Sequence, residues 1–344
     1  MQAITQDRYG SSEVLSLANI DKPAIRDGDV LVRVQAASIH VGDWIVMTGS
    51  PFVMRLATGL RKPKNRVPGT DIAGVIEAVG SDVADLRPGD EVFGWSSGAF
   101  AEYASGPADH FVRKPAGLTF EEASAVGVSA STALQLLRDD GKVRAGQKVL
   151  VNGASGGVGT FAVQIAKAVG AEVTAVTSTK NVDLVRSIGA DHVIDYTRED
   201  FTGAAGRYDL ILDNVGNHSM ARTRRALTST GTLISNGGGH QDGKLGRTIR
   251  AMLASLLVRQ QSAPSVKTQN HADLVALKSL VEAGSIRPVI DRTYPLAETP
   301  RAIAHVAAGH ARGTVVVTVA PPSAAVIAPE TPASGALLSV RSVA

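Results

Sequence analysis

The chain of 344 residues is long enough for two domains with substantial cores. Its apolar share of 44% and charged share of 19% are those of an ordinary globular protein, and a net charge of +3 with 4% aromatic residues does not predict a nucleic-acid partner. The sequence contains no cysteine, which excludes disulfides, thiolate nucleophiles and thiolate-bound zinc.

The N-terminus shows no targeting pattern. Residues 1–7 lack the basic-then-apolar order of a signal peptide, and no apolar run approaches the length of about 18 residues that a membrane span needs. We therefore expect a cytoplasmic protein without membrane insertion.

Residues 1–124 are predicted to form a barrel-like β domain. Strand patterns at 30–35, 71–80 and 92–93 are separated by Gly and Pro. The intervening stretch 55–68 is basic, which predicts a solvated loop or, alternatively, a site for an anionic ligand or surface. Its basic residues are Arg55, Arg61, Lys62, Lys64 and Arg66.

Strands and helices alternate after a helix predicted over residues 121–140. This order is typical of a doubly wound parallel sheet, in which the turn after the first strand binds a dinucleotide. The strands are predicted at 149–151, 172–177, 192–195, 208–212 and 232–235, and the helices begin at Val158, Val182 and His218.

The glycine-rich stretch between residues 152 and 160 organises this unit. A short apolar run precedes it, and apolar residues at helical spacing follow it until Gly170. Glycines here would let the backbone approach a pyrophosphate at a helix N-terminus, where free N–H groups and the helix dipole favour anions. The alternative is a turn that only packs a helix on a sheet. The residues expected to contact a cofactor are Gly153, Ser155, Gly156, Gly157, Val158 and Gly159.

The end of the next strand discriminates between the two nicotinamide cofactors. An acidic residue there would bind the ribose 2′-OH of NAD, but the stretch 175–181 has none. Ser178 and Lys180 suit a 2′-phosphate, so we predict NADPH over NADH. The alternative for Lys180 is a solvated residue at a helix start.

The C-terminal part adds three expected elements and a tail. Residues 247–259 form an amphipathic pattern with basic edges, which predicts packing against the body or a second subunit, or alternatively contact with a membrane surface. A helix is expected at 272–283 and a strand at 314–319. Residues from 320 onwards, rich in Pro, Ala and Ser, are expected to form a mobile tail.

Together these motifs resemble the medium-chain dehydrogenase/reductases, in particular their zinc-independent quinone oxidoreductase and enoyl reductase branch. The resemblance runs through Gly28-Asp-Val-Leu-Val, Pro68-Gly-Thr-Asp71, Arg87-Pro-Gly-Asp, the glycine turn and Gly284-Ser-Ile-Arg-Pro, and covers nearly all of the chain except the tail. Short-chain dehydrogenases also carry glycine-rich turns, but they need a Tyr with a Lys four residues later, and no tyrosine of this sequence has one.

The resemblance implies an α/β fold in which a doubly wound Rossmann domain is inserted into a mainly-β GroES-like catalytic domain. The implied catalytic domain comprises residues 1–124 and 266–320, the NADP-binding domain residues 125–265, and a flexible tail residues 321–344. Homodimers are common in the family and are expected here.

The alcohol dehydrogenase branch of this family binds zinc through two cysteines and the histidine of a Gly-His-Glu motif. Here that motif reads Gly69-Thr70-Asp71, and cysteine is absent. Without these ligands a tetrahedral zinc site cannot form, so we predict no metal.

The candidate catalytic residues follow from the same resemblance. The quinone reductase branch usually carries Asn in place of His40, an Asp matching Asp43, and often Tyr where Ile45 stands. His40 could donate a hydrogen bond to a carbonyl oxygen or deliver a proton. The alternatives are a hydrogen-bonded core histidine for His40, an N-cap of a helix at 44–48 for Asp43, and plain packing for Trp44 instead of the floor of an apolar pocket.

By resemblance, further cofactor contacts are expected from the helix at 121–140 and from the ends of later strands. These residues are Thr132, Asn214, Val215, Gly216, Asn236 and Gly237.

The sequence thus predicts a zinc-independent, NADPH-dependent oxidoreductase that transfers a hydride to a small apolar quinone or α,β-unsaturated carbonyl substrate. A biosynthetic enoyl or carbonyl reductase would use the same residues. The alternative of another class is a non-catalytic NADPH-binding interaction protein, motivated by the missing Tyr and the two basic segments.

Overall fold

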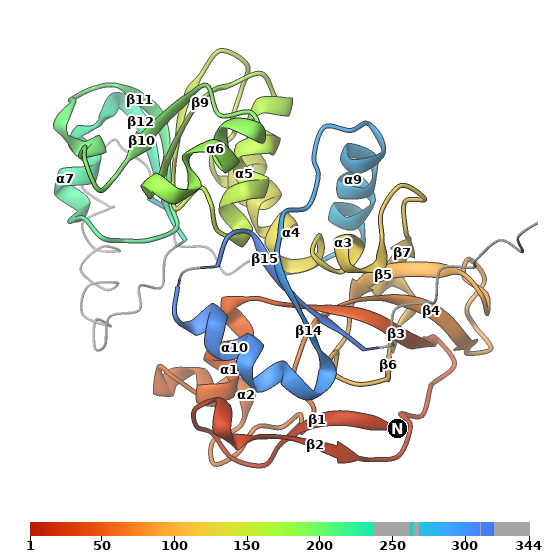
Figure 1. Ribbon diagram of the computed structural model, residues 1–344. Helices are drawn as coiled ribbons and strands as arrows, with labels where there is room; N and C mark the ends of the chain where they lie inside the picture. The colour runs from red at the N-terminus through yellow and green to blue at the C-terminus, as the bar shows by residue number, and fades with distance from the viewer. Residues whose placement is uncertain (237–261, 264–267, 310, 320–344) are drawn as a thin grey trace, which may run out of the picture.

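Two large sheets organise the computed structural model, which describes residues 1–236, 262–263, 268–309 and 311–319 (Figure 1). One sheet is parallel and the other is mixed and mainly antiparallel. The predicted α/β class with a doubly wound parallel sheet is confirmed. The predicted helix at 247–259 and the tail from residue 320 lie outside the described residues.

The mixed sheet is built from both ends of the chain. Its described strands follow the order β14-β15-β3-β4-β5-β7, and β6 also pairs with β3. In the long antiparallel pair of β3 and β4, Ser38 lies opposite Asp71. The strands are β3 (Asp29–Ile39), β4 (Asp71–Val79), β5 (Glu91–Trp95), β6 (Tyr103–Pro107), β7 (Phe111–Arg113), β14 (Ile290–Pro295) and β15 (Thr314–Thr318).

One face of β3 and β4 forms the core of this part, and alternate side chains such as Val32 and Ile76 are almost completely buried. A separate antiparallel pair, β1 (Gln2–Gln6) and β2 (Leu15–Asn19), lies beside this sheet.

The parallel sheet has the strand order β10-β9-β8-β11-β12-β13 in the described residues. Residues 149–151 of the central strand are completely buried, as expected for a strand covered on both faces. The order reverses at β8, which is the position where doubly wound sheets bind ligands. The strands are β8 (Lys148–Asn152), β9 (Glu172–Thr177), β10 (His192–Asp195), β11 (Tyr208–Asp213), β12 (Leu227–Ser235) and β13 (Ser262–Ala263).

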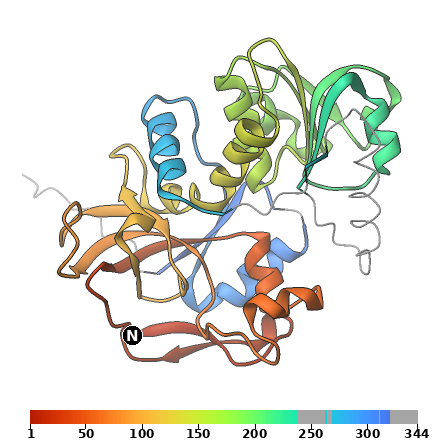
Figure 2. The ribbon, with the colours of Figure 1, turned by 180° about the vertical axis from the view of Figure 1, so that it is seen from behind.

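Helices cover the parallel sheet and connect it to the mixed sheet (Figures 1 and 2). The helices of this part are α3 (Phe120–Ser124), α4 (Gly127–Gln135), α5 (Gly157–Ala168), α6 (Val182–Ser187), α7 (Met220–Arg225) and α9 (His271–Glu282). The mixed sheet carries α1 (Val41–Thr48), α2 (Arg55–Thr58) and α10 (Thr299–Ala307). Short helical turns are η1 (Ser12–Val14), η2 (Phe52–Met54), η3 (Ala108–His110), η4 (Leu136–Asp140), η5 (Thr179–Asn181), η6 (Phe201–Gly203) and η7 (Leu296–Glu298).

The predicted helix at 121–140 is wrong in its extent, because the structure divides it into α3, α4 and the π-helical turn η4. Thr119 begins α3 with a capping box, in which its hydroxyl accepts from the N–H of Glu122 and the Glu122 carboxylate accepts from the N–H of Thr119. Apolar spacing continues across the breaks, so periodicity alone does not reveal them.

Three other predictions are corrected. The stretch 55–68, expected as a loop, begins with the short helix α2, which directly follows η2. The helix expected at 44–48 with Asp43 as N-cap is α1, which starts at Val41 with His40 as its N-cap. The helix expected from His218 starts at Met220, where Ser219 caps it.

Within the described ranges, no helix has the length and apolar character needed to cross a bilayer.

Candidate functional site

The glycine-rich turn lies at the centre of the parallel sheet, between the end of β8 and the start of α5. Gly153 has a φ of 76°, which L side chains rarely adopt, and a Cβ there would lie 2.8 Å from Val215 Cγ2. A Cβ on Gly159 would lie 2.1 Å from the Gly153 carbonyl oxygen, so only glycine lets α5 pack this closely. Gly156 is the N-cap and offers no side chain to the first N–H groups of α5. These groups are therefore available to an anion, which fits the pyrophosphate of a dinucleotide.

Asparagines at three strand ends form a hydrogen-bonded row beside this turn, in which Asn152 contributes its backbone carbonyl group. The Asn214 side-chain amide donates to the Asn152 carbonyl oxygen over 3.2 Å, and the Asn236 amide donates to Asn214 Oδ1 over 2.8 Å. The strand ends of β8, β11 and β12 thus meet at one edge, as expected for a ligand site in a parallel sheet. Gly237, predicted as their neighbour in the site, lies outside the described residues.

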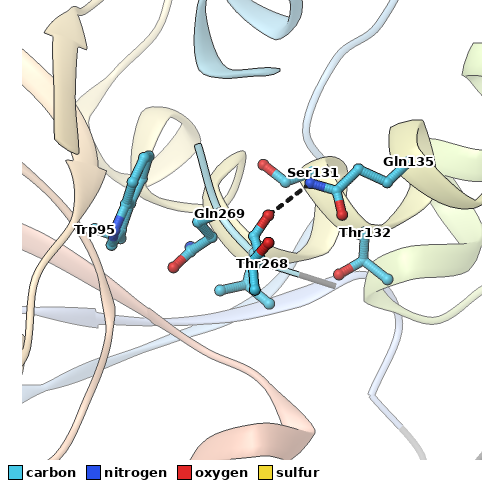
Figure 3. Close-up of a pocket in the computed structure, with 7 residues that line it drawn as sticks. Trp95, Ser131, Thr132, Gln135, Thr268 and Gln269 are labelled. Atoms are coloured by element: carbon cyan, nitrogen blue, oxygen red, sulfur yellow. Dashed lines mark hydrogen bonds between the residues drawn. The ribbon is translucent and has the colours of Figure 1, made fainter. Parts of the chain in front are cut away.

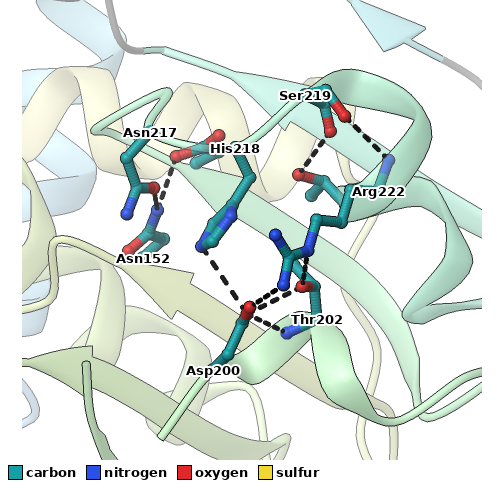
Figure 4. Close-up of polar contacts among 9 residues, drawn as sticks. Asn152, Asp200, Thr202, Asn217, His218, Ser219 and Arg222 are labelled. Atoms are coloured by element: carbon teal, nitrogen blue, oxygen red, sulfur yellow. Dashed lines mark hydrogen bonds and ion pairs between the residues drawn. The ribbon is translucent and has the colours of Figure 1, made fainter. Parts of the chain in front are cut away.

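Asp213 holds the next turn in place. Its Oδ1 accepts from the Asn152 amide at 2.8 Å and from the backbone N–H groups of Val215 and Gly216 at 3.1 and 2.9 Å. The Asn152 amide also donates to Asn217 Oδ1 at 3.0 Å (Figure 4). Asp213 therefore positions the three residues that the sequence singled out at 214–216, although sequence analysis did not identify it.

Figure 4 also shows a separate group of polar side chains, which surrounds Asp200 and connects η6 to α7. The Asp200 carboxylate pairs with the Arg222 guanidinium, accepts from the Thr202 N–H at 2.8 Å, and lies 3.6 Å from His218 Nε2. Arg222 Nε also donates to Thr202 Oγ1 at 2.8 Å. These polar groups satisfy one another, so the cluster stabilises the flank of the sheet.

The residues predicted to select the cofactor follow β9. Lys180 is exposed on η5, and Ser178 is the residue before that turn. The Asn181 amide donates to Ser155 Oγ at 3.0 Å, which connects this segment to the glycine turn. Tyr196 follows the neighbouring strand β10, donates its N–H to the end of β9 at 3.0 Å, and is 57% exposed. An exposed aromatic ring beside this segment can stack on a base, and its place directly after a strand is the signal that could have identified it.

An acidic residue also lies beside this segment, on the neighbouring strand. Asp195 accepts from Thr179 Oγ1 at 2.5 Å and from the Thr197 N–H at 3.0 Å, and its carboxylate is 3.6 Å from Arg198 Nε. The hydrogen bond from Thr179 is the main cause that lowers the pKa of Asp195. Its oxygens are therefore already bonded within the protein.

His40 lies at the end of β3 and begins α1. Its backbone N–H donates to Asp43 Oδ2 at 2.9 Å, and its ring Nε2 lies 3.6 Å from the same oxygen. The ring packs over Gly42, where a Cβ would approach two ring atoms to 2.7 Å. His40 Nε2 is buried and has no hydrogen-bond partner among the described residues. Nε2 thus has a hydrogen-bonding capacity that the described residues do not use.

Asp71 completes this group, although sequence analysis treated it only as part of the altered zinc motif. It is fully buried, and its carboxylate accepts from Ser38 Oγ at 3.2 Å, from the Val128 N–H at 2.9 Å and from the Gln269 amide at 3.3 Å. Burial raises the pKa of Asp71 to about 6, against the lowering effects of the His40 charge and the Val128 hydrogen bond. Asp71 is therefore ionised at neutral pH.

The buried Asp71 carboxylate restricts which residues can lie next to it. A Cβ on Gly127 would lie 2.4 Å from Asp71 Oδ1, so only glycine fits at the start of α4. Asp43 is also buried, and burial raises the pKa of its carboxyl group, while the charge of His40 lowers it. No sequence pattern reports burial at these positions, which is why Asp71 was missed.

A cavity of about 280 Å³ lies next to this group (Figure 3). Val128 and Gln269 take part in both, because they donate to Asp71 and line the cavity. Trp95 forms an apolar wall across from the polar side chains of α4, and its ring stacks on His110 with centroids 4.6 Å apart. The lining residues are Trp95, Val128, Ser131, Thr132, Gln135, Thr268 and Gln269.

The cavity lining includes one predicted cofactor residue, whereas the predicted catalytic residues His40, Asp43 and Trp44 lie outside it. Thr132 lines it as predicted by resemblance. Trp44 is half-buried and packs against the core of the mixed sheet, as in its alternative interpretation. Trp95, Gln135 and Gln269 were missed, because they come from three distant segments and no local motif connects them.

In the part of the chain that the structure describes, no three His, Cys, Asp or Glu side chains gather in a group that could hold a metal ion.

Comparisons with known proteins agree with this architecture. A family model described as "Alcohol dehydrogenase GroES-like domain" matches residues 26–116, and one described as "Zinc-binding dehydrogenase" matches residues 188–317. The chain is 35% identical to the mitochondrial NAD(P)H oxidoreductase RTN4IP1 of Mus musculus, over 93% of this chain and 89% of that protein. It is 32% identical to the chloroplastic NADPH-dependent alkenal/one oxidoreductase of Arabidopsis thaliana, over 92% of this chain and 79% of that protein.

A solved structure shows the same fold. The quinone oxidoreductase from Coxiella burnetii superposes with a TM-score of 0.81 and 29% identity, covering 93% of this chain and 99% of that one.

The Gly156→Ala variant should fold normally and bind a dinucleotide cofactor at least about tenfold more weakly, a loss of about 1.4 kcal/mol. A Cβ there would meet only the Gly153 carbonyl oxygen, at an ordinary 3.6 Å, so the added methyl group would mainly obstruct a ligand. Thermal unfolding and calorimetric titration measure the two effects. Gly159→Ala is the contrasting variant, since its clash at 2.1 Å should lower the melting temperature itself. Wild-type affinity in Gly156→Ala would contradict the placement of the pyrophosphate.

We expect the titration of Asp71 to lower the free energy of unfolding of the protein as the pH rises. Its pKa is raised to about 6 in the folded protein from 3.8, so the folded state keeps a proton that the unfolded state releases between these values. Its contribution to the free energy of unfolding should therefore fall by about 2 kcal/mol from pH 4 to pH 7. Melting temperatures of wild type and Asp71→Asn across this range test this, because their difference should shrink as the pH rises.

Asp90→Asn is the control for this titration. Hydrogen bonds from Arg87 and Arg113 outweigh burial and lower the pKa of Asp90, so its contribution is lost only at more acidic pH. The difference between wild type and Asp90→Asn should therefore stay constant from about pH 5 to pH 7. A constant difference for Asp71→Asn as well would contradict the raised pKa.

Proposed function

The chain belongs to the medium-chain dehydrogenase/reductase family, in its quinone oxidoreductase-like branch, and on that basis we propose that it reduces an apolar quinone or α,β-unsaturated carbonyl compound with NADPH. It is a nicotinamide-dependent oxidoreductase of this family. One observation supports the proposal most directly: a cavity with an apolar wall adjoins the buried Asp71, whose pKa the charge of His40 affects, and the ring Nε2 of His40 forms no hydrogen bond within the described residues.

The glycine turn and the ends of β9 and β10 would hold the cofactor. The first N–H groups of α5 would bind the pyrophosphate, and Lys180 and Ser178 would bind the 2′-phosphate. Tyr196 would lie against the base. Asp195 would not oppose the phosphate strongly, since Thr179, Thr197 and Arg198 already bond its carboxylate. The relative from Arabidopsis thaliana is named as NADPH-dependent, which supports the same preference.

When bound, the nicotinamide ring supplies the hydride. Negative charge then develops on the oxygen of the acceptor, and a donor that is already in position stabilises it. His40 can be this donor, because its Nε2 forms no hydrogen bond within the described residues and its backbone is fixed to Asp43. The buried carboxylate of Asp43 holds the histidine in place, because its Oδ2 accepts from the His40 N–H at 2.9 Å and lies 3.6 Å from the ring Nε2.

The acceptor class follows from the cavity and the relatives. Trp95 and Val128 give it an apolar side, while Ser131, Thr132 and Gln135 give it hydrogen-bonding groups. A planar conjugated carbonyl compound suits such a lining, because its ring or chain is apolar and one edge carries oxygen. Relatives are named for quinones and for alkenals or alkenones, and both classes combine these features.

Lys180→Ala should weaken NADPH binding roughly 10- to 100-fold and leave NADH binding within about twofold, since a charged hydrogen bond contributes about 1.5–3 kcal/mol. Titration of each cofactor against wild type and variant measures this difference. Arg186→Ala, which removes an exposed charge from α6 in the same domain, is the matched control and should leave both affinities unchanged. Equal losses for NADPH and NADH would refute the role of Lys180.

The function itself is tested by NADPH oxidation with a panel of quinones and enones and with product identification. Wild type should turn over at least one class, and His40→Ala should lower kcat at least about tenfold, which corresponds to about 1.4 kcal/mol of transition-state stabilisation. His40→Asn should retain most of the rate, because its amide also donates a hydrogen bond.

Two outcomes would count against this proposal. An unchanged rate in His40→Ala would remove the histidine from the mechanism. Tight NADPH binding without turnover of any acceptor would favour the non-catalytic alternative.

A further inference from the structure

An unusual concentration of exposed apolar side chains lies on η2, α2 and the residues that follow. Phe52 is 66% exposed, Leu56 67% and Leu60 60%, and Val53 is 49% exposed. Phe52 and Leu56 are four residues apart across a continuous helical turn, so they lie on one face. Single exposed apolar residues are normal, but a contiguous group on one short segment marks an interaction site.

The same segment is strongly basic. Residues 50–67 contain five Lys and Arg residues and no acidic residue. Arg66 pairs with Asp7 at 2.8 Å. Arg61, Lys62 and Lys64 are exposed and form no ion pair within the described residues. We call the exposed apolar and basic side chains together the α2 patch: Phe52, Val53, Leu56, Leu60, Arg61, Lys62 and Lys64.

Specific contacts hold this segment to the body of the protein. The Tyr9 hydroxyl bonds to Thr58 Oγ1 at 2.8 Å and donates to the Gly59 carbonyl oxygen at 2.6 Å. Arg55 Nε donates to the Gly49 carbonyl oxygen at 3.1 Å, and its guanidinium lies over the Tyr9 ring at 4.5 Å. The apolar side chains therefore project from a fixed support, and their exposure is a property of the fold.

We propose that the α2 patch docks the protein on an anionic lipid surface. Apolar side chains of this kind enter the headgroup region of a bilayer, while neighbouring lysines and arginines bind lipid phosphates. The charge complementarity identifies the occupant, because three unpaired cations beside four apolar side chains match a surface that is both anionic and apolar. Figures 1 and 2 show α2 at the outer edge of the mixed sheet. This contact is peripheral and involves no membrane span.

The patch is connected to the candidate site through α1. His40 begins this helix, and Gly49, which bonds to Arg55, ends it. If the proposed function holds, docking would bring the His40 end of the protein near acceptors dissolved in lipid; that consequence rests on the proposed function. Lipid binding itself does not, and it is measured without cofactor or acceptor.

Sedimentation with vesicles tests the proposal. Wild type should bind vesicles containing 30% phosphatidylserine at least about tenfold more tightly than pure phosphatidylcholine vesicles, and high salt should reduce this binding. Lys62→Gln/Lys64→Gln and Phe52→Ser/Leu56→Ser should each lower the affinity at least about tenfold with unchanged melting temperatures, since the replaced side chains are exposed.

Two control variants replace exposed lysines or exposed apolar residues at positions outside the α2 patch. Lys142→Gln/Lys148→Gln removes two exposed lysines from the other domain, and Leu17→Ser/Val275→Ser removes two exposed apolar residues. Both controls should bind vesicles as wild type does. Binding of wild type to neutral and anionic vesicles alike, or wild-type binding by the two patch variants, would overturn the proposal. It would also be overturned if light scattering showed a dimer that Phe52→Ser/Leu56→Ser dissociates, because the patch would then join two copies of the chain.

Discussion

One buried carboxyl group, that of Asp71, connects the mixed sheet to helix α4. It begins β4, and it accepts hydrogen bonds from Ser38 on the neighbouring strand, from Val128 on α4 and from Gln269. A carboxylate can be buried only where donors replace the water it loses, and these three donors come from three different segments. Gly127 leaves the space that the carboxylate occupies. The position of α4, and with it the cavity beside Asp71, therefore depends on how β3 and β4 pair.

The glycine turn is tied to the mixed sheet in a second way. The Gly313 N–H donates to the Ser155 carbonyl oxygen at 2.7 Å, and Gly313 and Gly156 form a parallel bridge. Gly313 directly precedes β15, which pairs with β3, the strand that ends at His40. Strand β3 thus positions His40 directly, and it positions the dinucleotide turn through the neighbouring strand β15. Reactions that depend on the distance between two bound molecules require such shared support, because small displacements of either one lower the rate.

Features encoded by consecutive residues could be predicted from the sequence, whereas features that depend on contacts between distant segments could not. The unit of β8, glycine turn and α5 could be predicted, because its strand, its glycines and its helical period are consecutive in the sequence. His40 and Asp43 were found because they lie only three positions apart, within one family motif. Asp71 was quoted as a motif residue but its role was missed, since its donors lie 33, 57 and 198 residues away. The break between α3 and α4 was missed for a similar reason. Gly127 is required there because a Cβ would clash with the Asp71 carboxylate of the mixed sheet, and the apolar period continues across the break.

The residue type at position 71 itself indicates a role beyond support. A helix start such as that of α4 can be capped by Ser, Thr or Asn, which bond its N–H groups without burying a charge. Asp71 instead keeps a charge in a fully buried position where burial raises its pKa to about 6, which is unfavourable for stability at neutral pH. Groups with strongly shifted pKa values are concentrated at functional sites, where the charge acts on a neighbour. The neighbour here is His40, whose charge interacts with both Asp71 and Asp43. Two buried carboxyl groups that interact with one histidine are more than a helix cap requires, and the role proposed for His40 rests on this arrangement.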